Sequence, residues 1–592
     1  MLGSNQPELM EYRAQNRWAI ILVTILMLIL ASRFFYLQIL AGEKYEKLAK
    51  INQIVRTRLP AERGEIRDRN GVLLAGNIHT KAVSIVPHYV EDLDGVLMVL
   101  QEVLELSHAR VAELREACET ALADKDARFR AILVKRSVVS QHCPEDAYLL
   151  ESREPEPYLW CPVCGTRYDQ MSGGQGQCPY DSSPLDKTDT GFLRCPKCER
   201  RFAVGEQCPV DGAALHHGIH NLACPRCTNL YTDQAAVLEA RLHELRGVEL
   251  DHVILRGYPH GPLAAHLLGY MNQVTRDDMD AHPGIYRPGD HIGRRGIERS
   301  LEEILRGRTG EQVYVRSSGG RKLSPEDLGA DLGNLRTEMP VQGNNVVLTI
   351  DVRIQEILLE AVEHTNSAAA VVLDVHNGEV LGMVSHPTFD SNVWSGRLTR
   401  ERKAEIDENP YYPMVNKATI AFPPASTFKM ITSLAGLNEG IGTFDTVVNC
   451  PGFYDFSDRR FHCFNRYGHG DLDLAHAMVG SCDVYFYRLG EWLGIDRLEK
   501  YATLFGLGAK TGIEIGESAG LVPSRAWHEK HSKGGFRPGF TLSTAVGQKD
   551  IRATPLQMAM VTAQVANGGK VIRPHLVHRI EDREGNVLRV TR

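Results

Sequence analysis

The sequence predicts a protein of three parts: one membrane-spanning helix near the N-terminus, a mixed α+β region with a cysteine-rich insert, and an α/β domain. Three observations support this fold class. A 23-residue apolar run lies near the N-terminus, eight of the 13 cysteines fall between Cys161 and Cys227, and a regular α/β pattern begins at about residue 336. The 592 residues give room for roughly two to four folding units of about 150 residues.

The composition is that of an ordinary globular protein. With 43% hydrophobic and 24% charged residues, it excludes wholesale disorder, a collagen-like repeat and a small disulfide scaffold. Lys plus Arg number 67 and Asp plus Glu number 74, which gives a net charge of −7. A general nucleic-acid binder would show a strong basic excess, so no nucleic-acid partner is expected.

The apolar run from Trp18 to Leu40 contains Arg33 as its only formal charge. As a helix it would extend about 35 Å, enough to cross a hydrocarbon layer of about 30 Å. A cleaved signal peptide would have a shorter apolar core and a small-x-small cleavage site, and a buried soluble helix would keep a polar stripe. Residues 18–40 are therefore predicted to be an uncleaved, single-pass anchor.

Residues 41–335 form the predicted α+β region. The stretch from Arg56 to Asn77 is extended and rich in turns, and the Asn70-Gly71 dipeptide inside it is typical of a tight hairpin turn. Helical patterns cover about 90–125, 234–246 and 296–307. The cysteine-rich insert occupies about 155–232.

Residues 336–592 show the compact α/β pattern. Residues 352–364 place their apolar side chains on one helical face, and residues 368–385 are two apolar strands joined by Asn377-Gly378, which predicts a hairpin. A further helix begins after Pro423-Pro424 and is apolar nearly all round, so it is expected in the core of the domain.

Ser426-Thr427-Phe428-Lys429 lies in the first turn of that apolar helix. The i, i+3 spacing puts Ser426 and Lys429 on one face, within reach of a hydrogen bond. A serine hydroxyl becomes a good nucleophile when a base removes its proton, and a lysine amine serves when burial and a helix N-terminus favour its neutral form. S-x-x-K also occurs often by chance, and then it means only a serine near a helix start and an incidental lysine.

Several ordered segments around this tetrapeptide resemble the class B penicillin-binding proteins of the penicillin-binding protein 2, or elongation, type. They cover nearly the whole chain outside the insert: RGEIRDRNGVLLAGN, RGYPHGPLAAHLLGY, GIERSLEEILRGRTG, LDVHNGEVLGMVSHPTFDSN, FPPASTFKM, SCDVYFYRLGEWLGID, FGLGAKTGIEIGE and ATPLQMAMVTAQVANGG. The resemblance implies a cytoplasmic tail (1–17), the anchor (18–40), an extended pedestal or dimerisation domain (41–335) and a transpeptidase domain of the β-lactamase/transpeptidase type (336–592). The bulk of the chain would lie outside the inner membrane, in the periplasm.

The resemblance also implies roles for individual residues. Ser426 would be the acylated nucleophile, with its backbone N–H as one oxyanion donor, and Lys429 would be the general base. Ser481-Cys482-Asp483 matches the second family motif, S-x-N or S-x-D. Ser481 would relay protons and Asp483 would fix the local geometry. The implied substrate is the D-Ala-D-Ala end of a peptidoglycan stem peptide, which is cleaved and passed to an amine on a neighbouring stem.

The third family motif, K-[ST]-G, would bind the substrate carboxylate and complete the oxyanion hole. Lys510-Thr511-Gly512 is a literal match, but it aligns with a loop that precedes the family segments at Gly547-Gln548 and residues 553–557. The motif is expected beyond residues 566–569 and past Arg592, so the transpeptidase domain is predicted to be C-terminally incomplete. One oxyanion donor is worth about 3 to 4 kcal/mol, so poor acylation by a fluorescent penicillin is expected.

A metal site is predicted beside the active site. Cys450, Cys463, His469 and Cys482 follow the spacing C-x12-C-x5-H-x12-C, and three thiolates with one imidazole suit tetrahedral Zn²⁺. Some elongation-type relatives hold zinc at this loop, and the positions correspond. A Cys450–Cys463 disulfide is the alternative in an oxidising compartment, but it leaves His469 and Cys482 unexplained.

The insert contains two similar cysteine units and a fragment. Its C-P-x-C pairs are typical of zinc ribbons, and disulfide pairing of the same thiols is the alternative. Asp181, Asp211 or the histidines 216, 217 and 220 could supply further ligands. We expect a metal-stabilised insertion, and a partner-binding module is the second interpretation. The predicted thiolate ligands are Cys161, Cys164, Cys178, Cys195, Cys198, Cys208, Cys224 and Cys227.

The leading functional hypothesis is a membrane-anchored D,D-transpeptidase that cross-links peptidoglycan during cell elongation and is inhibited by β-lactams. The resemblance implies a membrane glycosyltransferase of the shape-determining type and other elongation-complex proteins as partners. A non-catalytic scaffold of the elongation complex is the alternative, favoured by the missing third motif. Ser426, Lys429 and Ser481 favour the enzyme.

Overall fold

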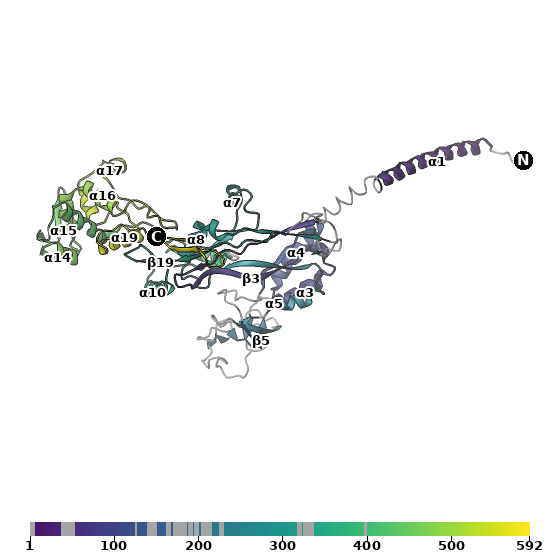
Figure 1. The fold of residues 1–592 in the computed structure, drawn as a ribbon, viewed down its shortest axis with the longest axis horizontal. Helices are drawn as coiled ribbons and strands as arrows, with labels where there is room; N and C mark the ends of the chain where they lie inside the picture. The colour runs from purple at the N-terminus through teal and green to yellow at the C-terminus, as the bar shows by residue number, and fades with distance from the viewer. Residues whose placement is uncertain are drawn as a thin grey trace. The chain divides into compact units, whose positions relative to one another are not determined.

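The computed structural model describes residues 6–36, 39, 54–124, 127–138, 151–160, 167–169, 186–187, 193–194, 201–202, 216–223, 230–231, 233–316, 322–323, 337–395 and 400–591 (Figure 1). The chain divides into two compact units. One comprises residues 1–60 and 309–340, and the other comprises residues 61–308 and 341–592.

The smaller unit contains helix α1 (Gln6–Phe35) and a three-stranded antiparallel sheet of β1 (Ile54–Leu59), β15 (Gly310–Arg316) and β16 (Lys322–Leu323). The first 18 residues of the predicted anchor, 18–35, are helical in α1. Within the part of the chain that the structure describes, no helix has the length and apolar character needed to cross a membrane.

The larger unit is organised around one mixed sheet. Its strand order is β12 (Val248–Gly257), β3 (Leu73–Ile85), β2 (Ile66–Arg67), β17 (Asn345–Leu348), β24 (Val577–Glu581) and β25 (Val587–Val590), and β4 (Ile132–Val138) also pairs with β3. β17 runs parallel to β2 and antiparallel to β24. Strands from both sides of residue 335 therefore belong to the same sheet (Figure 1).

Three helices cover the β3–β4–β12 part of this sheet: α3 (Leu93–Leu104), α4 (His108–Ala123) and α5 (Gln234–Arg241). The helical pattern at 90–125 is two helices, because Glu105 adopts a left-handed conformation (φ 55°) that ends α3 and Ser107 caps α4. The predicted helix at 296–307 is likewise divided at Leu301, into α8 (Gly296–Ser300) and α9 (Glu302–Leu305).

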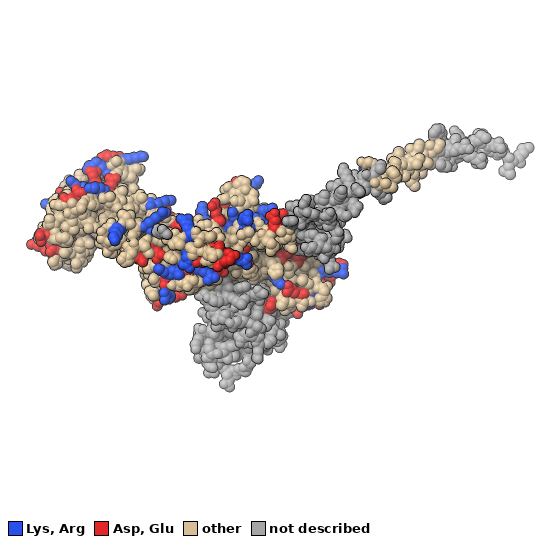
Figure 2. Space-filling model, in the orientation of Figure 1, with Lys and Arg blue, Asp and Glu red and all other residues tan. Residues whose placement is uncertain are grey.

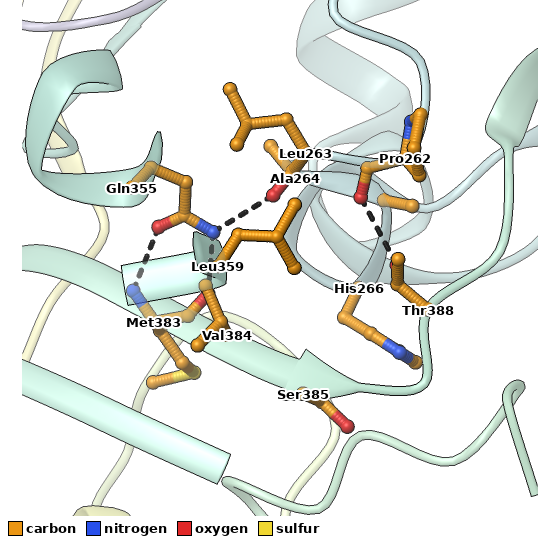
Figure 3. Close-up of a pocket in the computed structure, with 11 residues that line it drawn as sticks. Pro262, Leu263, Ala264, His266, Gln355, Leu359, Met383, Val384, Ser385 and Thr388 are labelled. Atoms are coloured by element: carbon orange, nitrogen blue, oxygen red, sulfur yellow. Dashed lines mark hydrogen bonds between the residues drawn. The ribbon is translucent and has the colours of Figure 1, made fainter. Parts of the chain in front are cut away.

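The predicted hairpins are confirmed. Gly71 (φ 89°) forms the turn between β2 and β3, and Gly378 (φ 83°) lies between β18 (Ala368–Leu373) and β19 (Val380–His386), which pair antiparallel. Helix α10 (Val352–Glu363) packs on β19, where the Gln355 amide exchanges hydrogen bonds with the backbone of Met383 (Figure 3).

A second core lies around α13 (Lys429–Asn438) and α15 (Asp483–Leu493). The predicted apolar helix after Pro424 begins as a 3₁₀ turn, Ala425–Phe428, and becomes α-helical at Lys429. The elements around these two helices are α14 (Leu474–Val479), α16 (Ile495–Leu504), α18 (Gly539–Ala545), β20 (Val448–Cys450), β21 (Phe453–Phe456), β22 (Arg459–His462) and β23 (Gly470–Leu472).

The remaining short elements of the larger unit are α6 (Ala265–Leu268), β13 (Met271–Gln273), α7 (Arg276–Ala281), β14 (His291–Gly293), α11 (Ser391–Ser395), α12 (Arg400–Asp407), α17 (Arg525–His531) and α19 (Pro555–Ala566). The insert contributes a sheet of β5 (Glu151–Trp160), β6 (Arg167–Asp169), β7 (Asp186–Lys187), β8 (Leu193–Arg194), β9 (Arg201–Phe202), β10 (His216–Ala223) and β11 (Leu230–Tyr231). The eight predicted cysteine ligands of the insert lie outside the described residues.

Candidate active site and its cysteine cluster

Ser426 lies in the 3₁₀ turn that precedes α13, and its side chain is exposed. A backbone hydrogen bond fixes the start of this turn, because Ala425 (φ 51°) donates its N–H to the carbonyl of Gly547 at 2.8 Å. A side chain at Gly547 would meet that backbone, since a Cβ there would lie 2.1 Å from the Ala425 carbonyl oxygen. Among the described residues, the Ser426 hydroxyl has no hydrogen-bond partner, so it is open to solvent and to an incoming substrate.

Lys429 is buried, with 1% of its surface exposed, at the first position of α13. Its amine donates hydrogen bonds to the Ser481 carbonyl oxygen at 2.8 Å and to the Ser481 hydroxyl at 3.1 Å. It also forms an ion pair with Asp483, 2.7 Å from Nζ to Oδ1. Burial of an ammonium group is tolerated only when charge and hydrogen bonds compensate its lost hydration, and these three contacts do so.

The second motif reaches Lys429 because of an unusual backbone. Ser481 has φ 47°, and its N–H bonds to Met478 at the end of α14, so its carbonyl and hydroxyl both face the amine. Asp483 opens α15, where a carboxylate is favoured by the helix dipole. Its second oxygen accepts the backbone N–H of Phe464 at 3.0 Å, so Asp483 joins the buried lysine to the loop before it.

Of the four predicted catalytic side chains, the structure therefore brings Lys429, Ser481 and Asp483 into direct contact. Ser426 is one turn away on the same segment and forms no hydrogen bond to Lys429. A substrate carbonyl that approaches Ser426 would meet a hydroxyl nucleophile, a nearby amine and a second hydroxyl. That combination is suited to acyl transfer through serine.

The predicted cysteine cluster forms on the other side of Asp483. Potential ligand atoms of Cys450, Cys463, His469 and Cys482 all lie within 4.8 Å of one another. The His469 Nδ1 is 3.6 Å from the sulfur of Cys450 and 3.6 Å from that of Cys463. The three cysteines are free thiols, so the Cys450–Cys463 disulfide is not formed here.

The thiols of Cys463 and Cys482 influence each other. The hydrogen bond between them lowers the pKa of Cys463 and raises the pKa of Cys482. One sulfur of the pair is thus prepared to be a thiolate, which is the form that binds metal ions. Three sulfurs and one imidazole nitrogen at these separations fit tetrahedral Zn²⁺.

Two glycines bring the ligand-bearing strands together. Gly452 (φ 96°) and Gly468 (φ 84°) lie where the chain crosses itself, and a Cβ at Gly468 would lie 2.3 Å from the carbonyl oxygen of Cys450. The N–H of His469 then bonds to the carbonyl of Cys450 at 2.9 Å. The glycine content of this loop thus allows the close backbone approach that gathers the cluster.

Comparisons with known proteins decide the family. Residues 368–591 match the model of the penicillin-binding protein transpeptidase domain, and residues 58–149 and 222–348 match the penicillin-binding protein dimerisation domain. Peptidoglycan D,D-transpeptidase MrdA of Acinetobacter baumannii is 27% identical over 577 residues, which cover 97% of this chain and 70% of that protein. The protein of the same name in Haemophilus influenzae is 35% identical over 363 residues, 60% of this chain and 54% of that one.

The chain therefore contains both domains of a penicillin-binding protein, and its relatives named above are of the MrdA type. It is a serine-type peptidoglycan D,D-transpeptidase of the elongation type. The fold agrees: penicillin-binding protein 2 of Helicobacter pylori, solved in complex with MreC, superposes with a TM-score of 0.60 at 23% identity, over 89% of this chain and 80% of that one. The dimerisation model leaves residues 150–221 unmatched, within which most of the cysteine-rich insert lies.

The literal K-T-G of this transpeptidase lies in a loop and not on a strand. The hydroxyl and N–H of Thr511 and the N–H of Gly512 all bond to the carboxylate of Glu517, at 2.8 to 3.0 Å. The donors that would bind a substrate carboxylate are therefore occupied by an internal one. Lys510-Thr511-Gly512 forms a closed carboxylate-binding turn in this structure.

Sequence reasoning missed two contacts in the transpeptidase site. The Phe464 N–H that bonds Asp483 and the Gly547 carbonyl that holds Ala425 are both backbone groups, far from their partners along the chain. Backbone donors and acceptors have no residue-type signature. For Gly547, the signal was a glycine in a helix-flanking Gly-Gln pair, which only the structure explains.

Proposed function

We propose that Ser426 is the nucleophile of this D,D-transpeptidase and that Lys429, Ser481 and Asp483 serve its proton transfers. The observation that carries the proposal is the buried Lys429 amine, bonded to Ser481 and Asp483 and one turn from the exposed Ser426. The Ser426 oxygen attacks the carbonyl of the penultimate D-Ala, and the terminal D-Ala leaves as its amine accepts a proton. An amine of a neighbouring stem peptide then takes the acyl group and frees Ser426.

Each proton in this scheme has a place. The attack needs a neutral Lys429 amine, so the proton of the Lys429–Asp483 pair must reside on the Asp483 carboxylate when Ser426 reacts. Lys429 then receives the Ser426 proton. The Ser481 hydroxyl, 3.1 Å from Nζ, passes its own proton to the leaving amine and takes a proton from Lys429 in return. Asp483 keeps the lysine in place through both half-reactions, because it is bonded to the backbone at Phe464 as well.

Covalent labelling tests this assignment. The full chain is incubated with a fluorescent penicillin until labelling is complete, and the adduct is located by mass spectrometry of peptides. We expect the label on Ser426 and at least a hundredfold slower labelling in Ser426→Ala, since the nucleophile is lost. The control is Ser367→Ala, an exposed serine outside the site. Undiminished labelling of Ser426→Ala would refute the assignment.

We also propose that Cys450, Cys463, His469 and Cys482 bind one structural Zn²⁺. The cluster's donor types and its spacing of 4.8 Å or less support it. Bound zinc would supply no catalytic chemistry here. The ligands would hold the loop at Cys463 against the start of α15, and so keep the Phe464 N–H and the Asp483 carboxylate in register.

Metal analysis by mass spectrometry tests the zinc proposal in the full chain. Because the insert cysteines form a second proposed zinc site, the measured quantity is the difference between variants. We expect Cys463→Ser with His469→Ala to lose one equivalent of zinc relative to the wild type. Cys118→Ala, a buried free cysteine elsewhere, should lose none. Equal zinc content in all three proteins would contradict the site.

We also propose that the chain is anchored in the inner membrane. The apolar run at 18–40 supports an inner-membrane anchor with a periplasmic catalytic domain, and the described side chains from Ile21 to Leu30 are largely exposed on α1, as lipid contact requires. Deletion of residues 1–40 should release the chain from the membrane fraction.

Two solved complexes contain a chain with this fold: a peptidoglycan synthase complex that coordinates polymerization and crosslinking, and penicillin-binding protein 2 with MreC. They support a glycosyltransferase and elongation-complex proteins as partners and peptidoglycan as substrate.

A further inference from the structure

A cavity of about 580 Å³ lies where α6 and α8 meet the chain segment that leads to the nucleophile. Its lining includes Arg294, Arg295 and Arg299, together with residues 414–416, 419–420 and 515–516. Its volume falls within the range of about 300–1,000 Å³ typical of small-molecule sites. None of the proposed catalytic residues lines it, so it is separate from the acylation site.

The charge of this cavity is one-sided. Its lining residues, all in the described part of the chain, include three arginines and no aspartate or glutamate. Arg294 is paired with Asp278 at 2.8 Å, but Arg295 bonds only a carbonyl, that of Met414, at 2.6 Å. Arg299 is exposed and forms no ion pair with any described carboxylate. On the face of the molecule drawn in Figure 2, acidic and basic side chains are interspersed.

His266 adds a neutral polar group to the same cavity. Its Nε2 is buried and has no hydrogen-bond partner among the described residues. Burial, with help from Lys417 and Arg295, lowers the pKa of His266 to about 3, so the imidazole is uncharged at neutral pH. The ring also borders a smaller neighbouring cavity of about 10 Å³, beside Thr388 and Pro262 (Figure 3). An unsatisfied buried nitrogen costs free energy unless a ligand or water completes it.

The walls also select for a ligand with a carbon skeleton. Phe389, Met414, Ile420 and Ile515 line the cavity together with Asn416 and Thr419. A free phosphate ion would leave most of this volume and all of the apolar wall unused. Guanidinium groups bind planar carboxylates through two parallel hydrogen bonds, and two of the three arginines have no acidic partner among the described residues. A ligand of short-peptide size that carries two or more carboxylates fits all of these features.

We propose that this cavity is an accessory binding site for a carboxylate-bearing peptide segment of the cell wall, with Arg295 and Arg299 as the principal anion contacts. The identity of the ligand rests on the peptidoglycan function of the chain, because uncross-linked stem peptides carry several free carboxylates. The wall at residues 414–420 continues directly into the turn that bears Ser426, so the site would hold a wall peptide near the transpeptidase centre without using that centre.

Calorimetric titration of the full chain carrying Ser426→Ala tests the proposal. The probe is the tripeptide L-Ala-γ-D-Glu-diaminopimelate, which lacks the D-Ala-D-Ala end and so is no acyl donor. We expect saturable binding, weakened at least about tenfold by Arg295→Gln with Arg299→Gln, since the lost charged hydrogen bonds are together worth more than about 1.4 kcal/mol. The control is Arg287→Gln, an exposed arginine outside the cavity, which should change binding less than about twofold.

Further measurements separate the possible results. Gly516→Leu should block binding without steric damage to the fold, because a Cβ at Gly516 meets no atom within 4 Å. Equal affinity in the double arginine variant, equal binding of the tripeptide triamide, or binding of inorganic phosphate without the tripeptide would each overturn the proposal. Penicillin labelling of Arg295→Gln/Arg299→Gln with native Ser426 should match the wild type. Penicillin labelling reports on the acylation site alone. A loss of labelling can therefore be distinguished from a loss of tripeptide binding at the accessory site.

Discussion

At the scale of single residues, two buried bases meet opposite environments. Lys429 is surrounded by a carboxylate, a carbonyl and a hydroxyl, which together replace its hydration shell. His266 lies near two cationic side chains, Lys417 and Arg295, and its own Nε2 has no hydrogen-bond partner among the described residues. The first arrangement keeps a charged group inside the protein. The second keeps a group neutral, and it makes the stability of the fold sensitive to acid.

The pH dependence of unfolding tests the environment of His266. Its pKa is about 3 in the folded chain and 6.5 when exposed, so between these values the unfolded state binds the additional proton. The stability that His266 contributes is therefore complete above about pH 6.5 and is lost as the pH falls toward 3. Relative to His266→Gln, the wild type should lose about 2 kcal/mol of unfolding free energy between pH 7 and pH 5. Urea unfolding at both pH values measures this, and parallel losses in the two proteins would contradict it.

At the scale of elements, the loop between β20 and α14 depends on backbone proximity more than on side-chain packing. Gly452 and Gly468 let two strands cross, and this crossing places Cys450 beside His469 and brings Phe464 to Asp483. The proposed metal ligands and the proposed catalytic lysine are thus joined by one short series of contacts, from the cysteine loop through the Phe464 N–H and Asp483 to Lys429. A substitution at the crossing should therefore affect Lys429 through Asp483, although none of the residues that contact Lys429 is itself replaced.

Two alanine substitutions in this loop separate crowding from backbone strain. Gly468 and Gly470 both have positive φ, 84° and 72°, but only at Gly468 would a Cβ strike backbone, the Cys450 carbonyl oxygen at 2.3 Å. Gly470→Ala should cost about 1 kcal/mol of strain. Gly468→Ala should cost at least about 1 kcal/mol more and slow penicillin labelling of Ser426, because Phe464 and Asp483 shift. Thermal unfolding and labelling rates measure both effects, and equal behaviour of the two variants would argue against the crossing.

At the scale of the whole larger unit, local sequence patterns predicted the elements and missed how they join. The Asn-Gly turns, the helix at 352–364 and the Cys450, Cys463, His469, Cys482 cluster followed from residue type and spacing, and the structure forms each of them. The pairing of β2 with β17 joins residues about 280 positions apart, and periodicity carries no information on such partners. The helix breaks at Glu105 and Leu301 were missed because single backbone angles override a continuing helical pattern.

The shared sheet makes a prediction about cooperativity across residue 335. Ile66 is fully buried on β2, in one hydrophobic core with Val346 and Leu348 of β17. Ile580 of β24 and Leu576, the residue before β24, belong to the same core. Ile66→Ala removes three carbons from that core and should cost about 2–5 kcal/mol. The loss of packing should destabilise strands on both sides of residue 335, because residues from both sides belong to this one core.

Hydrogen exchange followed by mass spectrometry measures where that cost falls. In Ile66→Ala, peptides from β17 and β24 should exchange faster, together with those from β2 and β3. The matched control is Ile357→Ala on α10, where the side chain is 64% exposed and its loss should change little. If faster exchange stayed within residues 61–308, the two halves would be separate cooperative units and the shared core would carry no coupling. If it extends to β24, a strand within the transpeptidase domain is stabilised by the N-terminal half of the chain, and changes in that half will alter the domain that bears Ser426.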